Sequence, residues 1–458
     1  MKLTSFRICR SILILLLWIP LVPSSSVLAD GQVTATPQEL APRERETVIQ
    51  ALVDTVRRDY IDDVGAERIA EVLGRNLSAG TYDELKTADE LAARLTRDLL
   101  DVTDDLHFHV LLDGDWVAAE RRKDVPEVAA ARRSRELEQD RRNNFGFKEI
   151  RRLEGNVGYL NLTYFADPET AHDTVAAAME LLAHRDAVIL DLRHNNGGYL
   201  EMAQLLCSYF LATVPSQLLF DFYDLENGER LERRQWVLPS VSGTRRPDVP
   251  LYLLTSSTSF SAAEWFAFIL KNLGRATVIG ETTAGGAHPV QRRVLNDRFV
   301  LQVPTGEAKD GVLGEDFEGR GVAPHVEAAS ADALHVAHAR ALEDLTRIHP
   351  DSADRYAWFE PVIRARASAQ GLGSTPPADV AGYYDGRRVV LRDGALFYGW
   401  DGEAKIPLHV LEDDLLALDG IDDFRFRIVR DDGKVTALER VFMDGGRRLH
   451  PKDPGTAP

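Results

Sequence analysis

The spacing of apolar residues changes along the chain, from helical periodicity near the start to dense strand patterns near the end. Between residues 38 and 105, apolar side chains recur three or four positions apart, as in Leu91, Leu95 and Leu99. That spacing places them on one face of a helix. Breaks near residues 62–65 and 78–81 divide the segment, so we expect a helical bundle of about three helices over 38–105.

Two short stretches of different character follow this segment. Residues 104–112, DDLHFHVLL, alternate polar and apolar positions and predict a short strand. Residues 120–142 are highly charged and predict a solvated helix or a linker. Because acidic and basic side chains are mixed throughout the second stretch, it does not indicate a nucleic-acid-binding segment.

From residue 145 onward, apolar strands alternate with helical patterns. The four apolar runs that indicate strands are NVGYLNLTYF, DAVILDL, PLYLLTS and ATVIG. Continuous apolar strands alternating with helices are typical of βαβ units around a buried parallel sheet. We therefore predict an α/β core over residues 106–345, with a last helix from about 330 to 349.

The C-terminal part of the chain has no helical pattern. Residues 350–376, which end in GLGSTPPADV, predict a linker. Residues 377–458 give strand after strand, separated by Asp-Gly and Asp-Asp-Gly turn signals. This pattern predicts a small all-β accessory domain, either a barrel or a sandwich.

Residues 1–29 have the layout of a secretory signal peptide. A basic start precedes the apolar run 12–22, and Val27-Leu28-Ala29 gives a small-residue cleavage pattern. The apolar run is short for a membrane span, so an uncleaved N-terminal anchor is the alternative. We expect an exported protein, periplasmic or secreted, that meets a membrane only if this segment is retained.

Cysteine content and charge exclude several classes of site. Cys207 is the only cysteine after the predicted signal, so we expect neither an intrachain disulfide nor a Cys/His zinc cluster. The net charge is −18, which argues against nucleic acid as a general partner.

Three loops that directly follow buried strands are candidates for chemistry. They are RHNNGGY after Leu192, SSTSFS after Thr255 and ETTAGGAH after Gly280. If their strands are parallel neighbours, all three loops lie at one edge of the sheet, where ligand sites gather. Gly197 and Gly198 can expose backbone N–H groups that stabilise an oxyanion, or they can simply form a tight turn.

The serine-rich loop also allows two interpretations. Ser261 precedes Glu264 by three residues at the start of an apolar helix, which is a capping-box pattern. The same place suits a nucleophile, because a helix start presents free N–H groups. A nucleophilic serine needs a base, and His107, His109 and His288 are the candidates.

Five motifs in order resemble the tail-specific (C-terminal processing) serine peptidases, in the branch of interphotoreceptor retinoid-binding protein and the tricorn core. The motifs are GNVGYLNLTYF, VILDLRHNNGG, TSSTSFSAAEWFAFILKN, TVIGETTAGGA and FEGRGVAPHVE. The resemblance covers roughly residues 40–345. It implies a crotonase-like ββα fold for the core.

The resemblance also implies roles for individual residues. Ser261 matches the family nucleophile, and the N–H groups of Ala262 and of Gly197 or Gly198 match the oxyanion hole. The position of the lysine base used by one branch is Gly286 here, so the resemblance implies the histidine base of the tricorn-like branch, His107 in DLHFHV.

Glu318 in EGRGVAP matches the glutamate of that branch's catalytic network. Leu106 replaces the usual glycine before the histidine, which keeps His109 as an alternative base. Residues 110–143 are too few for the peptide-binding PDZ domain of the lysine branch.

The sequence therefore predicts an exported serine endopeptidase that acts on peptide or protein substrates through Ser261, His107 and Glu318. No cofactor, metal or nucleic acid is expected. The alternatives are a non-catalytic binding protein for hydrophobic ligands on the same fold, and a hydrolase of small esters or amides.

Overall fold

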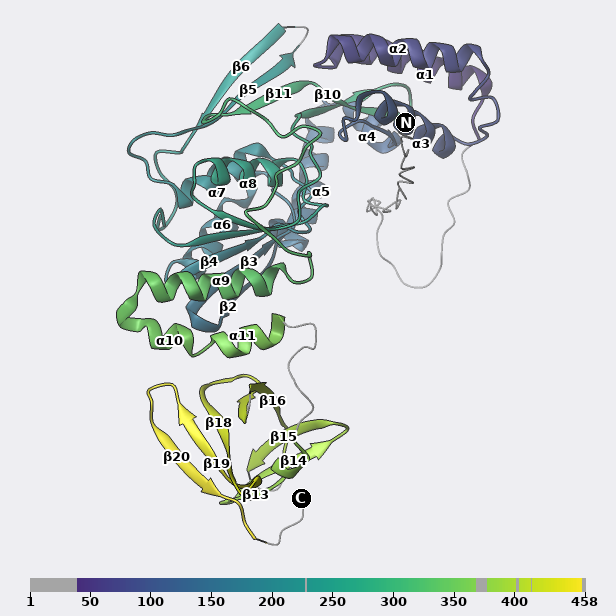
Figure 1. The fold of residues 1–458 in the computed structure, drawn as a ribbon. Helices are drawn as coiled ribbons and strands as arrows, with labels where there is room; N and C mark the ends of the chain where they lie inside the picture. The colour runs from purple at the N-terminus through teal and green to yellow at the C-terminus, as the bar shows by residue number, and fades with distance from the viewer. Residues whose placement is uncertain (1–38, 227–228, 368–376, 401–402, 413, 455–458) are drawn as a thin grey trace, which may run out of the picture.

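The computed structural model describes residues 39–454, apart from 227–228, 368–376, 401–402 and 413. The predicted signal peptide lies outside the described residues, as does the last part of the predicted linker. Figure 1 shows a central α/β core, a helical module beside it and a β domain beneath it. The predicted fold class, α/β with N-terminal helices and a C-terminal β domain, is confirmed.

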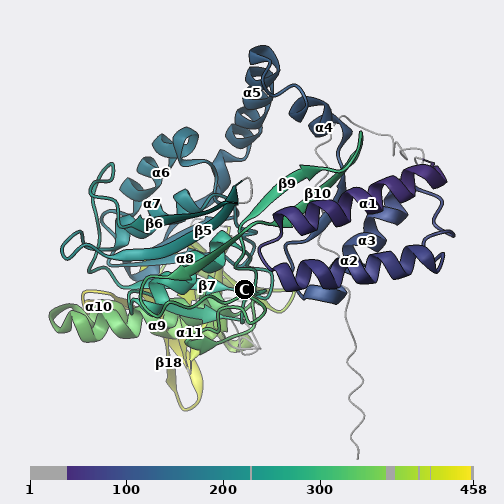
Figure 2. The same cartoon turned by 90° about the horizontal axis from the view of Figure 1, so that it is seen from above.

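The N-terminal module contains three helices that pack on a small sheet. The helices are α1 (Pro42–Asp59), α2 (Asp63–Ser78) and α3 (Ala88–Thr103), and α3 begins with a capping box between Thr87 and Glu90. The sheet has the order β1-β10-β9 and is antiparallel: β1 (His109–Leu112), β10 (Phe299–Pro304) and β9 (Val290–Val294). Because β9 and β10 come from the core, the module and the core share this sheet (Figure 2).

The predicted strand at residues 104–112 is shorter in the structure. Residues 104–108 form a turn, and only His109–Leu112 pair with β10. Asp104 at the end of α3 has a left-handed backbone, with φ of 58°, which turns the chain away from the helix axis. His107 therefore lies in a turn before the strand.

Most of the charged stretch 120–142 forms the helix α5 (Pro126–Arg142), and the short helix α4 (Gly114–Glu120) precedes it. No residue of α5 is buried, which agrees with the predicted solvated helix.

The core is a six-stranded sheet of order β12-β8-β7-β4-β3-β2. The antiparallel edge strand β2 precedes five parallel strands. The bounds are β2 (Phe147–Leu153), β3 (Val157–Leu162), β4 (Ala187–Asp191), β7 (Leu251–Thr255), β8 (Thr277–Gly280) and β12 (Val326–Glu327). Alternate residues of one strand enter different cores. In β4, Val188 and Leu190 pack with the helices of one face, whereas Ala187 and Ile189 pack with those of the other.

Helices cover both faces of this sheet. The connecting helices α6 (Pro168–Leu182), α7 (Leu200–Phe210) and α8 (Ala262–Asn272) share one apolar core with one face. The other face packs on α9 (Ala333–Ile348), with α10 (Ala353–Ala357) beyond it. In Figure 1, α9, α10 and α11 (Glu360–Ala367) lie between the sheet and the β domain.

The helices α10 and α11 correct the predicted linker at 350–376, because most of that segment is helical. Tyr356, Phe359 and Ile363 are buried against α9, so the segment belongs to the core.

A second three-stranded sheet was not predicted. It has the order β11-β5-β6 and contains β5 (Leu218–Glu226), β6 (Glu229–Trp236) and β11 (Gly306–Asp310).

The C-terminal domain is an eight-stranded antiparallel meander. Its strands are β13 (Gly382–Tyr384), β14 (Arg387–Arg392), β15 (Ala395–Trp400), β16 (Ile406–Glu412), β17 (Leu415–Leu418), β18 (Ile421–Asp431), β19 (Lys434–Phe442) and β20 (Arg447–Pro451). A bridge between Tyr384 and Lys452 joins the first strand to the end of the last one. The domain is therefore barrel-like, one of the two predicted forms.

Candidate active site

The three candidate loops lie together at one edge of the core sheet. They follow β4, β7 and β8, which are parallel neighbours, and this arrangement was predicted. Backbone hydrogen bonds join them directly: Phe260 N–H donates to Asn195 O at 3.0 Å, and Ala284 N–H donates to Ser259 O at 3.1 Å. The glycine-rich and serine-rich turns are thus parts of a single site.

The serine-rich loop is held to the loop after β4 by its own hydroxyl groups. Ser259 Oγ donates to Leu192 O at 2.8 Å. Ser256 Oγ and Thr258 Oγ1 donate to Arg193 O at 2.5 and 2.9 Å. Ser256 and Ser259 therefore have structural partners, and Ser257 is exposed to solvent.

Ser261 has an unusual backbone conformation. Its φ is 55° and its ψ is −122°, at the N-cap position directly before α8. Such a conformation costs a residue with a side chain about 1–3 kcal/mol and is found mainly at functional sites. The surrounding hydrogen bonds must therefore hold Ser261 in place.

Glu264 provides much of that support. Its fully buried carboxylate accepts hydrogen bonds from the Ser261 N–H at 2.9 Å, the Gly286 N–H at 2.9 Å and the Gly285 N–H at 2.7 Å. Thr283 Oγ1 donates to the same carboxylate. Burial raises the pKa of Glu264, although these hydrogen bonds oppose the rise. One carboxylate thus joins the serine turn to the loop after β8.

Gly197 lies directly against the serine. A Cβ at this position would stand 2.7 Å from Ser261 Cβ and 2.9 Å from Ala262 N, so only glycine fits. Gly197 N–H donates to Asn195 Oδ1 at 2.9 Å and is therefore occupied. Among the described residues, the N–H groups of Gly198 and Ala262 donate no hydrogen bond. These two donors are free to bind an oxyanion beside Ser261.

His107 lies next to the serine turn. Its ring stacks on Phe260, the residue before Ser261, with ring centroids 4.5 Å apart. The side chain is buried, and neither ring nitrogen has a hydrogen-bond partner among the residues that the structure describes. His107 thus does not hydrogen-bond to Ser261 here. Burial lowers the pKa of His107, so the ring is neutral at pH 7 and can accept a proton.

Gly286 leaves the space that the His107 ring occupies beside Phe260. A Cβ on Gly286 would stand 2.2 Å from the Phe260 ring and 2.7 Å from His107 Cε1. The two rings fill the space that a side chain at position 286 would need. A lysine at this position and the observed His107 are therefore mutually exclusive.

Asp105 fixes the turn that carries His107. Its Oδ1 accepts the His107 backbone N–H at 3.1 Å and lies 3.7 Å from His107 Nδ1. Gln302 of β10 donates to His107 O at 3.0 Å. Burial opposes ionisation of Asp105, but the two neighbouring histidines dominate and hold its pKa well below the usual range.

His288 and Glu318 complete the polar cluster. His288 Nδ1 lies 2.7 Å from Asp105 Oδ2 and 3.7 Å from Glu318 Oε2. The Ala287 and His288 N–H groups donate to Glu318 Oε2 at 2.5 and 3.2 Å.

The pKa values of these two groups follow from burial and mutual charge. Burial alone would lower the pKa of His288, but Asp105 and Glu318 together raise it to about 8. Burial and the charge of Asp105 raise the pKa of Glu318 to about 7. Glu318 contacts His288, and Asp105 is the carboxylate that lies beside His107.

The surroundings of His109 and Leu106 differ from those of His107. His109 is on β1, half-buried, and its Nδ1 lies 3.5 Å from His107 O. Leu106 is 38% exposed, so its side chain takes no space from the buried His107 ring.

Sequence reasoning missed two residues of this site. Asp105 stands two positions before His107, and Asn195 stands two positions before Gly197. Buried Asn195 accepts from Gly197 N–H and donates from Nδ2 to Leu162 O. Both residues stand inside motifs quoted above, Asp105 in DLHFHV and Asn195 in VILDLRHNNGG, but a motif position alone does not show which partner a polar side chain contacts.

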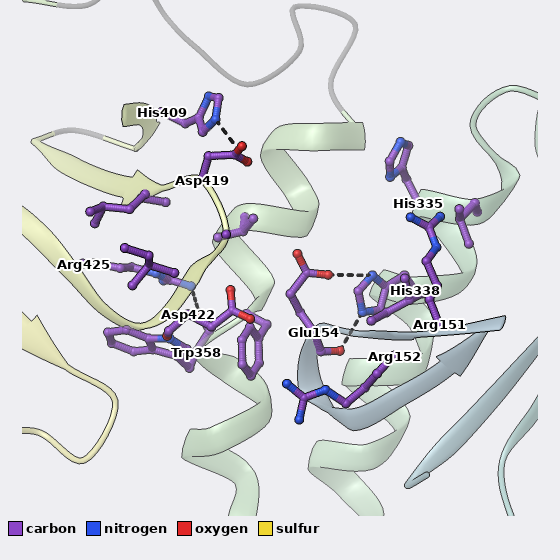
Figure 3. A pocket seen from close by; sticks show the side chains of 18 residues that line it. Arg151, Arg152, Glu154, His335, His338, Trp358, His409, Asp419, Asp422 and Arg425 are labelled. Atoms are coloured by element: carbon purple, nitrogen blue, oxygen red, sulfur yellow. Dashed lines mark hydrogen bonds and ion pairs between the residues drawn. The ribbon is translucent and has the colours of Figure 1, made fainter. Parts of the chain in front are cut away.

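A cavity of about 460 Å³ lies elsewhere, between the core and the β domain (Figure 3). Charged side chains contribute to its wall: Arg151, Arg152, Glu154, Asp419, Asp422 and Arg425. It shares no lining residue with the site around Ser261. Apolar side chains complete the lining, among them Leu153, Trp358, Phe359 and Ile421.

Comparison with known proteins agrees with the predicted resemblance. Residues 156–328 match the model of Peptidase family S41. The match includes Gly197, Gly198, Ser261 and Glu318, whereas His107 precedes it. The resemblance to the tail-specific peptidases is thereby confirmed.

Curated relatives match over part of their length. The carboxy-terminal processing protease CtpB of Bacillus subtilis is 27% identical over 30% of this chain and 27% of its own. The carboxyl-terminal-processing protease of Picosynechococcus sp. is 30% identical over 28% of this chain and 29% of its own. The chain thus spans under a third of the length of these two relatives.

Among solved structures, the photosystem II D1 C-terminal processing protease has a TM-score of 0.39 and 15% identity, over 64% of this chain and 94% of that one. A lipoprotein from Streptococcus agalactiae has a TM-score of 0.44 and 17% identity, over 67% and 98%. No helix in the described part of the chain is long and apolar enough to cross a membrane.

Proposed function

We propose that this chain, which carries a Peptidase family S41 region at residues 156–328, is a serine peptidase with Ser261 as its nucleophile. The observation that carries the proposal is the surroundings of Ser261. A strained serine, two free N–H donors and a neutral buried histidine occupy one edge of the sheet. Each of these features serves acyl transfer. A serine that only caps a helix would need none of them.

In the proposed reaction, Ser261 Oγ attacks the carbonyl carbon of the scissile peptide bond, and His107 accepts the hydroxyl proton. The oxyanion that forms is bound by the N–H groups of Ala262 and Gly198. Gly197 contributes its lack of a side chain and its fixed backbone, because its own N–H is bonded to Asn195. His107 then donates the proton to the leaving amine, and water hydrolyses the acyl-enzyme by the reverse use of the same groups.

The two carboxylates of the cluster, Asp105 and Glu318, have different roles in the proposed mechanism. We assign Asp105 to the orientation of His107, because it lies 3.7 Å from His107 Nδ1. Glu318 supports the same network through His288, which contacts both carboxylates. The lack of a hydrogen bond between His107 and Ser261 is compatible with catalysis, since such hydrogen bonds often form only when substrate binds.

Two other proposals from the sequence remain distinguishable by experiment. A hydrophobic-ligand carrier would bind its ligand stoichiometrically without turnover, so titration with a retinoid or a fatty acid separates it from a peptidase. A hydrolase of small esters or amides would use the same nucleophile, so cleavage of peptides separates it from a peptidase. The N-terminal pattern of residues 1–29 supports export to the periplasm or medium.

Labelling with a fluorophosphonate probe tests the nucleophile. The purified chain should be labelled at one site, and Ser261→Ala should abolish labelling. Ser257→Ala is the matched control, because Ser257 lies in the same loop with an exposed side chain, and it should label like the wild type. A folded wild-type protein that does not react, or a Ser261→Ala variant that still does, refutes the assignment.

The base assignment has its own test with two neighbouring histidines. His107→Ala should reduce the labelling rate by at least about a hundredfold, the usual range for loss of a general base. His109→Ala should leave the rate within about threefold, because His109 lies on β1 with its ring against the His107 carbonyl. The reverse order of effects would reject His107 as the base.

A further inference from the structure

The polar cluster beside the proposed active site brings together three metal-ligating side chains from separate parts of the chain. Asp105 follows α3 of the helical module, His288 ends the loop after β8, and Glu318 lies in the segment before β12. One nitrogen or oxygen atom from each lies within 4.8 Å of the others. His288 Nδ1 is hydrogen-bonded to Asp105 Oδ2 at 2.7 Å and lies 3.7 Å from Glu318 Oε2. Shifts of about 0.5 Å, with loss of the proton between His288 and Asp105, would give the spacing of about 3.3 Å between ligands of a tetrahedral Zn²⁺ ion.

The cluster also contains buried polar atoms without partners. Glu318 Oε1 and both ring nitrogens of His107 lack a hydrogen-bond partner in the described structure. The His107 side chain is only 3% exposed, and its Nδ1 faces Asp105 Oδ1 at 3.7 Å. Buried unsatisfied polar groups are rare in native proteins and point to a catalytic role or to a bound water or ion. The free ring nitrogens of His107 fit its proposed role as the base, whereas Glu318 Oε1 has no such role and is available to an ion.

We propose that Asp105, His288 and Glu318 form a binding site for a divalent cation of the Zn²⁺ type. One imidazole nitrogen and two carboxylate oxygens are the donor set that Zn²⁺ accepts. Ca²⁺ and Mg²⁺ prefer sites made of oxygen alone, so the histidine selects against them. Two carboxylates balance the charge of the ion.

This proposal departs from the expectation that the protein contains no metal, and it does not rest on the proposed peptidase activity. A bound ion would tie the helical module, through Asp105, to two loops of the core. Occupancy should therefore stabilise the folded protein, because a ligand that binds only the native state raises its stability.

Zn²⁺ binding to the untagged full chain, first stripped with a chelator, tests the proposal. Competition with a chromophoric chelator should give one Zn²⁺ per chain, and the melting temperature should rise on addition of the ion. His288→Asn and Glu318→Gln should each weaken binding at least tenfold and remove the thermal shift. Circular dichroism checks that both variants are folded.

The matched control is His172→Asn on α6. His172 also has a carboxylate neighbour, Asp173 at 3.1 Å, but both side chains are largely exposed to solvent. It should bind Zn²⁺ like the wild type. Absence of stoichiometric binding by the wild type, or equal affinity in folded His288→Asn and Glu318→Gln, would overturn the proposal whether or not Ser261 proves to be a nucleophile.

Discussion

The glycine at position 286 allows a histidine to serve as the base of the proposed catalytic site. Gly286 leaves room for the rings of His107 and Phe260, which a Cβ would approach to 2.7 and 2.2 Å. Gly286→Ala should displace this stacked pair and reduce the rate of fluorophosphonate labelling at least tenfold. The labelling rate measures the effect directly.

Gly74→Ala serves as the control for this change. Gly74 lies within α2, and nothing lies within 4 Å of the added methyl group. Its labelling rate should match the wild type. Unchanged labelling of Gly286→Ala would mean that the stacked position of His107 is not the reactive one.

Among individual residues, the sequence predicted those that stand in loops directly after buried strands. Ser261 and Gly197 stand in motifs that follow buried strands, and the structure brings the two together. Asp105 stands in the DLHFHV motif, but its contact with His288 spans 183 positions and depends on how the helical module docks, so its role was not predicted. A pairwise contact of that kind cannot be read from local spacing.

Among the elements, strand β4 positions the active-site loops through its last residue. Asp191 is buried, accepts a hydrogen bond from Tyr159 Oη at 2.7 Å, and pairs with Arg193 at 2.6 Å. Burial opposes ionisation, but Arg193 and Tyr159 together lower the pKa of Asp191 below its usual 3.8. This carboxylate therefore stabilises the protein above about pH 3.8, and the contribution is lost as the pH falls through the lowered pKa.

Asp191→Asn should lower the free energy of unfolding of the core by about 3 kcal/mol at pH 7, because it leaves Arg193 without its buried partner. The difference from the wild type should begin to shrink as the pH falls below 3.8 towards the lowered pKa of Asp191. Urea unfolding at pH 7 and near pH 3 measures both. Asp173→Asn, at a fully exposed carboxylate, should show little change, and an equal loss there would contradict a specific role for Asp191.

The elements that the sequence predicted best are those buried on both sides. The strands β3, β4, β7 and β8 read as continuous apolar runs because helices cover both faces of their sheet. Strands β6 and β9 were missed because they are rich in charged residues, as ERLERRQW in β6 shows. The predicted linker was wrong because α10 and α11 are only five and eight residues long, so their apolar pattern is weak.

Across the whole molecule, the β domain docks on α10 and α11 through a few specific contacts. Trp358 Nε1–H donates to Asp422 O at 2.8 Å, and the Arg425 guanidinium lies 4.3 Å from the Trp358 ring centroid (Figure 3). Trp358→Ala should weaken docking by about 2 kcal/mol and separate the unfolding of the β domain from that of the core in calorimetry.

Labelling of Ser261 should stay within about twofold of the wild type in this variant, because the cavity shares no residue with that site. Trp400→Ala removes a tryptophan of the same domain that is 56% exposed, and it should leave a single transition. A large loss of labelling in Trp358→Ala would instead connect the β domain to catalysis.

The central claim, that this is a peptidase acting through Ser261, is tested most directly by peptide cleavage itself. A mixture of unstructured peptides is incubated with the wild type, Ser261→Ala and Ser257→Ala, and the products are identified by mass spectrometry. The account predicts new peptide termini with the wild type and Ser257→Ala, and none with Ser261→Ala. Cleavage that persists in Ser261→Ala, or a wild type that is labelled at Ser261 but cleaves esters and no peptide, would contradict it.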